Sequence, residues 1–200
     1  MAATLTRRPR RLTAEARRQA ILASAKQVFG SRGYHDTTTR EIAAAAAVSE
    51  ALLYQHFDGK RQLFEAVVHT AAAQLERRIE AATEGPQPLD QALYAFFEFV
   101  EEEAALYRVF FRQALQTDPA FEHLYVELSA RLFDLVGGSL GREGFADRDR
   151  AEMVAHALGG MVGELALWWL DARKYNRGQM VAQAARMGRA IYLSEVGDGS

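Results

Sequence analysis

Residues 33–60 constrain the fold of this chain more than any other part of its sequence. Within them, Thr38 and Glu41 have the spacing of a capping box, which predicts a short helix over about residues 39–46. Ser49 is a suitable N-cap for a second short helix, which ends before an Asp-Gly pair. Two short helices joined by a tight turn form a helix-turn-helix, which places its second helix in the major groove of DNA. The segment therefore predicts a DNA-binding domain.

The order of residue types in this segment is also distinctive. Its ordered positions are Gly33, Tyr34, Thr37, Thr38, Thr39, Arg40, Glu41, Ile42, Ala43, Ala46, Ala47, Val48, Ser49, Leu53, Tyr54, Gln55, His56, Phe57 and Lys60. This order resembles the tetracycline-repressor (TetR) family of bacterial transcriptional regulators. The resemblance implies an all-α fold, in which an N-terminal three-helix helix-turn-helix DNA-binding domain precedes a helical ligand-binding and dimerisation bundle. The family usually has glycine where this chain has Ala47, and if that residue adopts a positive φ, alanine costs on the order of 1 kcal/mol there.

The rest of the chain carries helical patterns, and its four prolines fall where those patterns break. Apolar spacing predicts a helix from after Thr13 to about Ser31 and another over about residues 60–82. Further helices are predicted at about residues 89–102, 104–116, 119–140, 147–173 and 178–194. The expected domains are a disordered basic arm (1–12), a helix-turn-helix DNA-binding domain (13–60) and a ligand-binding and dimerisation domain (61–200).

Charge is distributed unevenly along the chain. Residues 1–61 carry 11 lysines and arginines against 5 acidic residues, whereas the remainder carries 13 basic and 21 acidic residues. A basic N-terminal region suits a domain that meets DNA phosphates, and the arginines of the arm could add phosphate or minor-groove contacts. The sequence has no cysteine, no signal-like apolar segment after its basic N-terminus and no charge-free apolar stretch as long as a membrane span. We therefore expect a cytoplasmic protein with no membrane association, metal or cofactor.

The residues expected to contact DNA lie on and beside the two short helices. Phosphate contacts are assigned to groups that donate to phosphate oxygens without reading sequence: Thr38, Thr39, Arg40, Tyr54, His56 and Lys60. Base contacts are assigned to side chains that can match base edges, which are Arg40, Glu50, Ala51 and Gln55, and Ser49 is a further groove-facing candidate. Each could instead contact only water or phosphate. In the family that the chain resembles, these motif positions contact DNA.

A homodimer is expected, because one short helix buries too little surface for operator affinity and two copies would read a palindrome. The best candidate interface lies in the last two predicted helices. It comprises small residues and large apolar ones: Gly159, Gly160, Gly163, Leu165, Trp168, Trp169, Met180, Ala184, Met187, Gly188 and Ile191. These residues could instead form core within one chain, but the resemblance, which implies a four-helix dimer bundle, favours the interface.

The middle of the second domain is rich in aromatic residues, which at helical spacing form either core or the walls of a pocket. In the resembled family the same helices enclose an effector pocket, and such pockets are largely apolar with a few polar anchors. The expected pocket residues are Phe96, Phe97, Tyr107, Phe110, Phe111, Tyr125 and Trp168, with Arg108, Arg112 and Glu164 as charged candidates. An inward arginine would hold a carboxylate or phosphate, which makes a fatty acid or an acyl-CoA a candidate effector.

Together these features predict a DNA-binding transcriptional regulator. The preferred hypothesis is a dimeric repressor that leaves a palindromic double-stranded DNA operator when an apolar or amphiphilic small molecule binds, although activation is also compatible with the sequence. The alternative is a nonspecific, architectural DNA-binding protein without an effector, which would lose sequence preference as salt rises. An enzyme is not expected, because the sequence contains no metal-ligand cluster, nucleophile elbow, phosphate-binding loop or paired-carboxylate motif.

Overall fold

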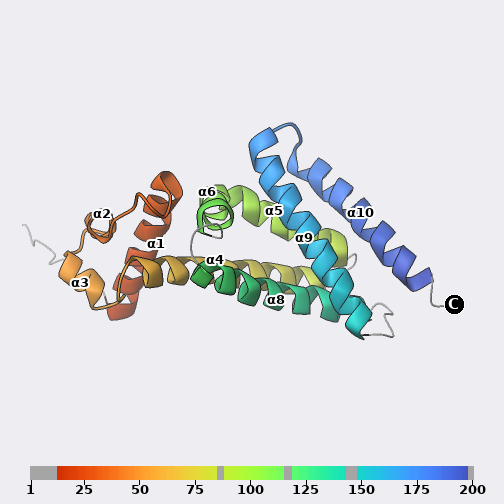
Figure 1. Cartoon of the computed structure of the whole chain (residues 1–200), viewed down its shortest axis with the longest axis horizontal. Helices are drawn as coiled ribbons and strands as arrows, with labels where there is room; N and C mark the ends of the chain where they lie inside the picture. The colour runs from red at the N-terminus through yellow and green to blue at the C-terminus, as the bar shows by residue number, and fades with distance from the viewer. Residues whose placement is uncertain (1–12, 85–87, 115–118, 143–147, 198–200) are drawn as a thin grey trace, which may run out of the picture. The chain divides into compact units, whose positions relative to one another are not determined.

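The computed structural model describes residues 13–84, 88–114, 119–142 and 148–197 (Figure 1). The regular elements in these ranges are helices and no strand occurs among them, which confirms the predicted all-α fold. The chain divides into two compact units, Met1–Val67 and Val68–Ser200. The basic arm predicted over residues 1–12 lies outside the described residues.

The first unit ends later than the domain boundary that the sequence indicated. It is built from α1 (Ala14–Arg32), α2 (Thr39–Ala45), α3 (Glu50–Tyr54) and the first turns of α4 (Lys60–Thr83). The division falls inside α4 because the first turns of that helix complete the core of the first unit. Leu63 and Phe64 are fully buried there, and the Phe64 ring meets the Phe29 ring edge to face, with 5.0 Å between their centres.

Local sequence signals start the helices of the first unit. Thr13, the N-cap of α1, accepts a hydrogen bond from the backbone N–H of Ala16 at 3.1 Å. Thr38 and Glu41 form both bonds of the predicted capping box at the start of α2, and the Ser49 hydroxyl caps α3. Each cap satisfies N–H groups that a helix N-terminus otherwise leaves without partners. The predicted starts of these helices are confirmed.

The turn between α2 and α3 has left-handed backbone at Ala47, whose φ is 53°. The end of α2 forms a Schellman motif, in which the N–H of Val48 donates to the carbonyl oxygen of Ala43 at 3.0 Å and the N–H of Ala47 to that of Ala44 at 3.1 Å. This closure requires a positive φ at residue 47. Ala47 therefore has the positive φ at which alanine is less favourable than glycine.

The second unit contains the rest of α4 and a series of further helices. These are α5 (Pro88–Glu102), α6 (Ala104–Arg108), η1 (Val109–Ala114), α8 (Pro119–Arg142), α9 (Arg148–Ala172) and α10 (Arg177–Gly197). The sequence predicted one helix over residues 104–116, but η1 is a π-helix that directly continues α6. Helical turns of this kind are rare and occur frequently at functional sites.

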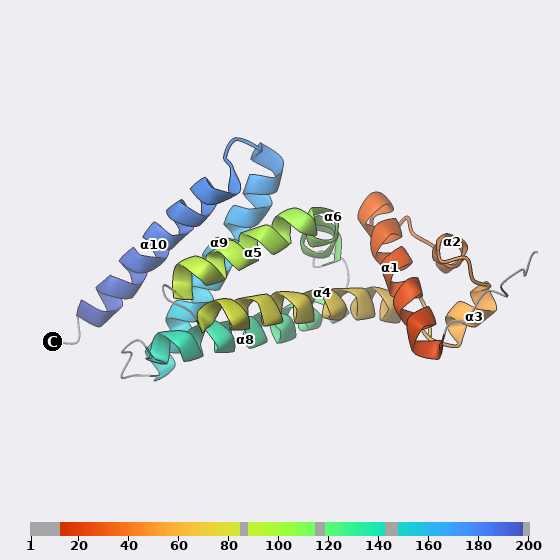
Figure 2. The ribbon, with the colours of Figure 1, turned by 180° about the vertical axis from the view of Figure 1, so that it is seen from behind.

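Helix α9 packs against α8, and α10 packs against both α5 and α9, as Figures 1 and 2 show from opposite sides. Arg177 joins α10 to α5 through ion pairs with Glu98 at 3.0 Å and Glu101 at 3.4 Å. These groups are partly exposed, so each pair contributes at most about 1 kcal/mol. Apolar contacts hold the unit more strongly, as where the fully buried Phe97 ring meets the Trp169 ring edge to face at 5.6 Å.

One stretch of the described residues, Glu152–Ala172 in α9, is long and apolar enough by composition to cross a membrane, with a mean hydropathy of 1.3. The sequence had not indicated such a stretch. Of this window, 39% is buried against the rest of the chain, and core helices of soluble proteins have the same length and hydropathy. The finding is therefore only a weak indication of a membrane span.

Candidate DNA-binding and effector sites

The residues predicted to contact DNA all lie in the first unit, on and beside α2 and α3. Thr38, Arg40, Ser49, Glu50, Ala51, Tyr54 and Gln55 are exposed, and Thr39, His56 and Lys60 are partly exposed. The apolar positions that were predicted to anchor α3 are buried, since Leu53 is 0% exposed and Phe57 is 2% exposed. Burial of these two side chains fixes which face of α3 carries its polar groups to the surface.

Three of these side chains are joined by hydrogen bonds. Thr39 Oγ1 lies 2.8 Å from Glu50 Oε1 and 3.2 Å from Tyr54 Oη. Because an ionised carboxylate only accepts hydrogen bonds, the Thr39 hydroxyl donates to Glu50 and the Tyr54 hydroxyl donates to Thr39. This network joins α2 to α3 through residues that the sequence had assigned separately to phosphate and base contacts.

Lys60 is held by the loop that follows α1. Its ammonium group donates to the carbonyl oxygens of Tyr34 and His35, each at 3.0 Å, and lies 4.7 Å from the centre of the Tyr34 ring. Two of its three protons are thus used within the chain. Lys60 fixes this loop and has one proton left for the phosphate contact that the sequence predicted.

Glu41 sets the position of the residues at the start of α2. Its carboxylate accepts hydrogen bonds from the backbone N–H of Thr38 at 3.0 Å and from the Thr38 hydroxyl at 2.9 Å, and it pairs with Arg32 at 2.6 Å. The backbone bond first, then the hydroxyl bond and the Arg32 charge, hold the pKa of Glu41 below its usual range. The residue therefore supports Thr39 and Arg40 without being a predicted DNA contact itself.

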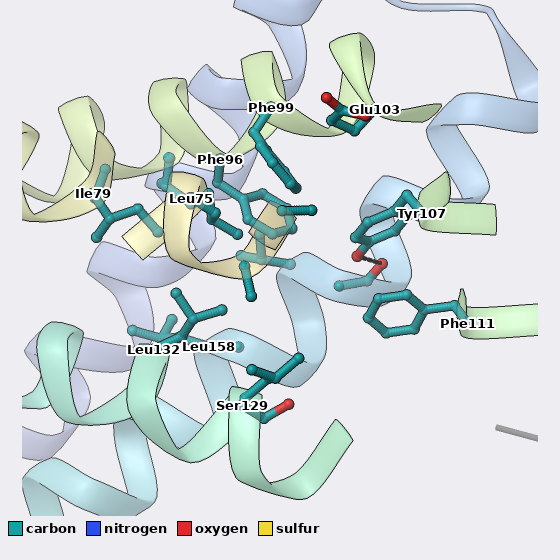
Figure 3. Close-up of a pocket in the computed structure, with 18 of the residues that line it drawn as sticks. Leu75, Ile79, Phe96, Phe99, Glu103, Tyr107, Phe111, Ser129, Leu132 and Leu158 are labelled. Carbon is teal, nitrogen blue, oxygen red and sulfur yellow. Dashed lines mark hydrogen bonds between the residues drawn. The ribbon is translucent and has the colours of Figure 1, made fainter. Parts of the chain in front are cut away.

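The second unit surrounds an apolar cavity of about 200 Å³. Its walls come from every helix of the unit, and Figure 3 shows how their side chains gather around one space. The labelled apolar residues of this lining are Leu75, Ile79, Phe96, Phe99, Phe111, Leu132 and Leu158. A concave, mostly apolar space of this kind suits the hydrocarbon part of a small molecule.

A few polar side chains also face the cavity, among them Glu103, Tyr107 and Ser129. The Tyr107 hydroxyl donates to the carbonyl oxygen of Gly163 at 3.3 Å, which is the dashed line in Figure 3. Burial raises the pKa of Tyr107, so the hydroxyl remains a donor. Among the residues that the structure describes, the cavity lining includes no lysine, arginine or histidine, and no cluster of histidine and acidic side chains suited to a metal ion occurs anywhere.

Half of the predicted pocket residues line this cavity. They are Phe96, Tyr107, Phe110, Phe111 and Tyr125. They form a continuous aromatic wall, since the Tyr107 and Phe111 rings stack at 4.4 Å and the Phe111 and Tyr125 rings meet edge to face at 5.4 Å. Because η1 carries two of them, the π-helix is part of the cavity wall.

Two of the three charged residues predicted for the pocket, Arg108 and Glu164, do not line it. Arg108 donates to the carbonyl oxygen of Leu170 and pairs with Asp171 at 3.3 Å, so its charge fastens α6 to the end of α9. Glu164 is an exposed residue of α9. The side chain of Arg112 lies outside the described residues. Arg108 is therefore not the inward arginine that the sequence predicted.

Two predicted aromatic residues also lie outside the lining. Phe97 is fully buried, but it packs against Trp169 in the core between α5 and α9. Trp168 is 48% exposed and lies beside Tyr175, with 5.8 Å between the ring centres. Neighbouring residues on a helix point in directions about 100° apart, so Phe96 and Phe97 reach different surroundings.

Sequence reasoning missed the small residues that make room for the cavity. Ala155, Gly159 and Gly163 of α9 and Ala184 and Gly188 of α10 are part of its lining. Most of these had been predicted at a dimer interface. Their spacing of four residues was the available signal, because it places a continuous strip without side-chain bulk along one helix face. The residues of α4 that line the cavity were missed as well: Val68, Ala71, Ala72, Leu75 and Ile79.

The residues predicted at the dimer interface lie in two different surroundings, some in the core of this chain and others on its surface. Met180, Ala184 and Gly188 are buried within the chain, and a Cβ on Gly188 would lie 3.3 Å from Leu158, so this stripe of α10 faces its own core. The exposed face of α9 carries two others of the predicted residues, Gly160 with open space beside it and Trp168 at 48% exposure. Met153, which had not been predicted, lies on the same face at 66% exposure.

Comparison with known proteins assigns the family. Residues 21–67 match the family described as bacterial regulatory proteins, tetR family, and residues 86–190 match the tetracyclin repressor-like C-terminal domain. The chain is 32% identical over 169 residues to the HTH-type transcriptional activator FasR of Mycolicibacterium smegmatis, covering 82% of this chain and 77% of FasR. It is 31% identical over 182 residues to the HTH-type transcriptional repressor BepR of Brucella suis, covering 82% and 87% of the two chains.

A solved structure shows the same fold. The transcriptional regulator FadR from Bacillus subtilis, in complex with stearoyl-CoA, superposes with a TM-score of 0.73 at 16% identity, covering 85% of this chain and 96% of that one. The helix-turn-helix of the first unit and the helical second unit agree with both sequence matches. The chain therefore belongs to the TetR family of bacterial transcriptional regulators, which are DNA-binding proteins.

Proposed function

We propose that this protein is a cytoplasmic, dimeric repressor that leaves a palindromic operator when an apolar or amphiphilic small molecule occupies the cavity of the second unit. The observation that carries the ligand-dependent part is the cavity itself, an apolar space of about 200 Å³ in a member of a DNA-binding family. The first unit is the DNA-binding part, and the second unit holds the effector and the dimer interface. The effector must bind the DNA-incompetent form more tightly, and a coupling of about 1–3 kcal/mol is enough to change occupancy.

The lining favours an effector whose buried part is uncharged. A free carboxylate inside would meet the carboxylate of Glu103 and no basic group among the described lining residues, and burying an unpaired charge is costly. A thioester or ester carbonyl, in contrast, carries no charge, and it could accept the Tyr107 hydroxyl proton in place of the carbonyl oxygen of Gly163. An acyl-CoA is therefore preferred over a free fatty acid, with its acyl chain inside and its phosphates outside. The stearoyl-CoA complex of the structurally similar FadR supports this choice.

The exposed face of α9 is the proposed dimer interface. Met153, Gly160 and Trp168 recur at spacings that place them on one side of the helix, and two of them are large apolar side chains exposed to solvent. A monomer measured by native mass spectrometry would contradict this part of the proposal.

The cavity is tested by a matched pair of alanine substitutions in the second unit. Ala155 of α9 is 1% exposed and lines the cavity, whereas Ala81 of α4 is exposed, does not line it and lies outside the proposed dimer interface. Oleoyl-CoA at 100 times its Kd should stabilise the wild-type protein by about 2.7 kcal/mol, measured by thermal denaturation, and coenzyme A without its acyl chain should not. Ala155→Leu should abolish the stabilisation, and Ala81→Leu should leave it intact. Equal stabilisation of both variants would place the ligand elsewhere.

The regulatory role is tested with DNA. The wild-type protein should enrich a palindrome from duplexes of random sequence and keep its preference at about 150 mM salt. Loss of that preference would favour the architectural alternative. A reporter placed behind the enriched duplex then decides the direction, because a repressor lowers transcription until the effector is added and an activator raises it.

A further inference from the structure

Glu50 brings a negative charge among the side chains that would meet DNA phosphates. It is the first residue of α3, it is exposed, and its carboxylate lies 2.8 Å from the Thr39 hydroxyl oxygen. Tyr54, one turn further along α3, reaches the same hydroxyl at 3.2 Å. The carboxylate thus closes a chain of hydrogen bonds that runs from Tyr54 through Thr39 to Glu50.

This chain uses the hydrogen-bond donors that a phosphate would need. Threonine and tyrosine hydroxyls carry one proton each. The Thr39 proton goes to the Glu50 carboxylate and the Tyr54 proton goes to Thr39, so neither is available while the chain of bonds is intact. A phosphate that approaches these hydroxyls must displace a carboxylate of the same charge sign, and like charges about 4 Å apart repel by about 1 kcal/mol even in water.

We infer that Glu50 is a specificity-determining residue that penalises binding to arbitrary DNA. Duplex phosphates release the carboxylate from Thr39, and the released carboxylate needs a new donor. The N4 amino group of cytosine in the major groove is the base donor that suits a glutamate. An operator with a C·G pair beside Glu50 supplies this donor and offsets the lost hydrogen bond from Thr39. An operator with another base pair there does not. The inference rests on the proposed function, in which the first unit binds duplex DNA.

The test compares Glu50→Gln with a charge-matched control in the same unit. Glutamine keeps the length of the side chain and an oxygen that can accept from Thr39, but it removes the charge. Glu15→Gln removes an equal charge from the exposed first turn of α1. The affinity of each protein is measured for a pool of random duplexes and for the duplex that the wild-type protein enriches from that pool, at one salt concentration.

Glu50→Gln should raise affinity for the random pool about fivefold, which is the effect of one like-charge contact of about 1 kcal/mol. Its affinity for the enriched duplex should rise less or fall, and sequences enriched by the variant should lose one C·G preference. Glu15→Gln should change neither ratio. Equal gains on both kinds of duplex, a gain from Glu15→Gln of the same size, or no gain from Glu50→Gln would each overturn the inference. If the wild-type protein enriches no sequence at all, the proposed function fails first, and the two failures are thereby distinguished.

Discussion

Replacement of Ala47 by glycine should stabilise this protein, although glycine normally weakens a helical segment. Ala47 has a φ of 53°, in the left-handed region, where an L-residue costs about 1–2 kcal/mol relative to right-handed backbone. Glycine removes that cost but loses about 0.5–1 kcal/mol through its greater freedom in the unfolded chain. The Ala47 side chain is exposed, so its removal sacrifices little buried surface. The net expectation is a gain of about 0.5–1 kcal/mol in the free energy of unfolding.

Ala44 provides the matched control, because it is also an exposed alanine but lies within α2. Glycine there should lower the free energy of unfolding by about 0.5–1 kcal/mol, so the two substitutions should have opposite signs. Urea unfolding followed by circular dichroism gives the free energies, and hydrogen exchange of the peptides that span α2 and α3 locates the change. If Ala47→Gly destabilises the protein as Ala44→Gly does, Ala47 does not occupy left-handed backbone in solution and the reasoning is refuted.

Three further substitutions test the roles assigned to charged and polar groups. Lys60→Ala should lower the free energy of unfolding by about 1–2 kcal/mol, measured by urea unfolding, and weaken binding to all duplexes alike. An altered base preference after Lys60→Ala would contradict the assignment. Glu41→Gln should reduce the fall in melting temperature that accompanies a decrease in pH, as measured by thermal denaturation. The folded-state pKa of Glu41 is lowered, so its contribution is present above about pH 4.3 and is lost as pH falls through the folded value. Tyr107→Phe should cost about 1 kcal/mol at neutral pH by removing the bond to Gly163. Because the folded-state pKa of Tyr107 is raised, its contribution is present below about pH 10 and lost above it, so the stability of the wild-type protein should fall toward that of the variant in alkali.

The features that the sequence predicted well are those decided within a few residues. The capping box of Thr38 and Glu41 and the N-cap at Ser49 use side chains three residues or fewer from the N–H groups that they satisfy. The cost of alanine at residue 47 was anticipated from the resemblance to the family, which usually has glycine there, and one backbone angle determines that cost. Leu53 and Phe57 were correctly predicted to be buried, because they lie one turn apart on the same side of the second short helix and the turn after it.

The features that the sequence predicted poorly depend on partners far along the chain. Arg108 was a plausible pocket anchor until its partner, Asp171, was known, and 63 residues separate the two. The π-helical turn that brings Phe110 and Phe111 to the cavity leaves no distinct sequence pattern. Neighbouring aromatic residues such as Phe96 and Phe97 could not be divided between cavity and core, because only packing against α9 separates them.

The two faces of α9 explain how a ligand could act on the dimer without touching it. Ala155, Gly159 and Gly163 line the cavity on one face, whereas Met153 and Trp168 are exposed on another. A helix moves as a rigid rod over such short distances, so a molecule that widens the cavity by displacing the first face also displaces the second. If the exposed face is the dimer interface, effector binding and subunit geometry are linked, and the linkage must be reciprocal. A variant that weakens the dimer through Trp168 must then change the affinity for the effector by the same coupling factor, although Trp168 does not line the cavity.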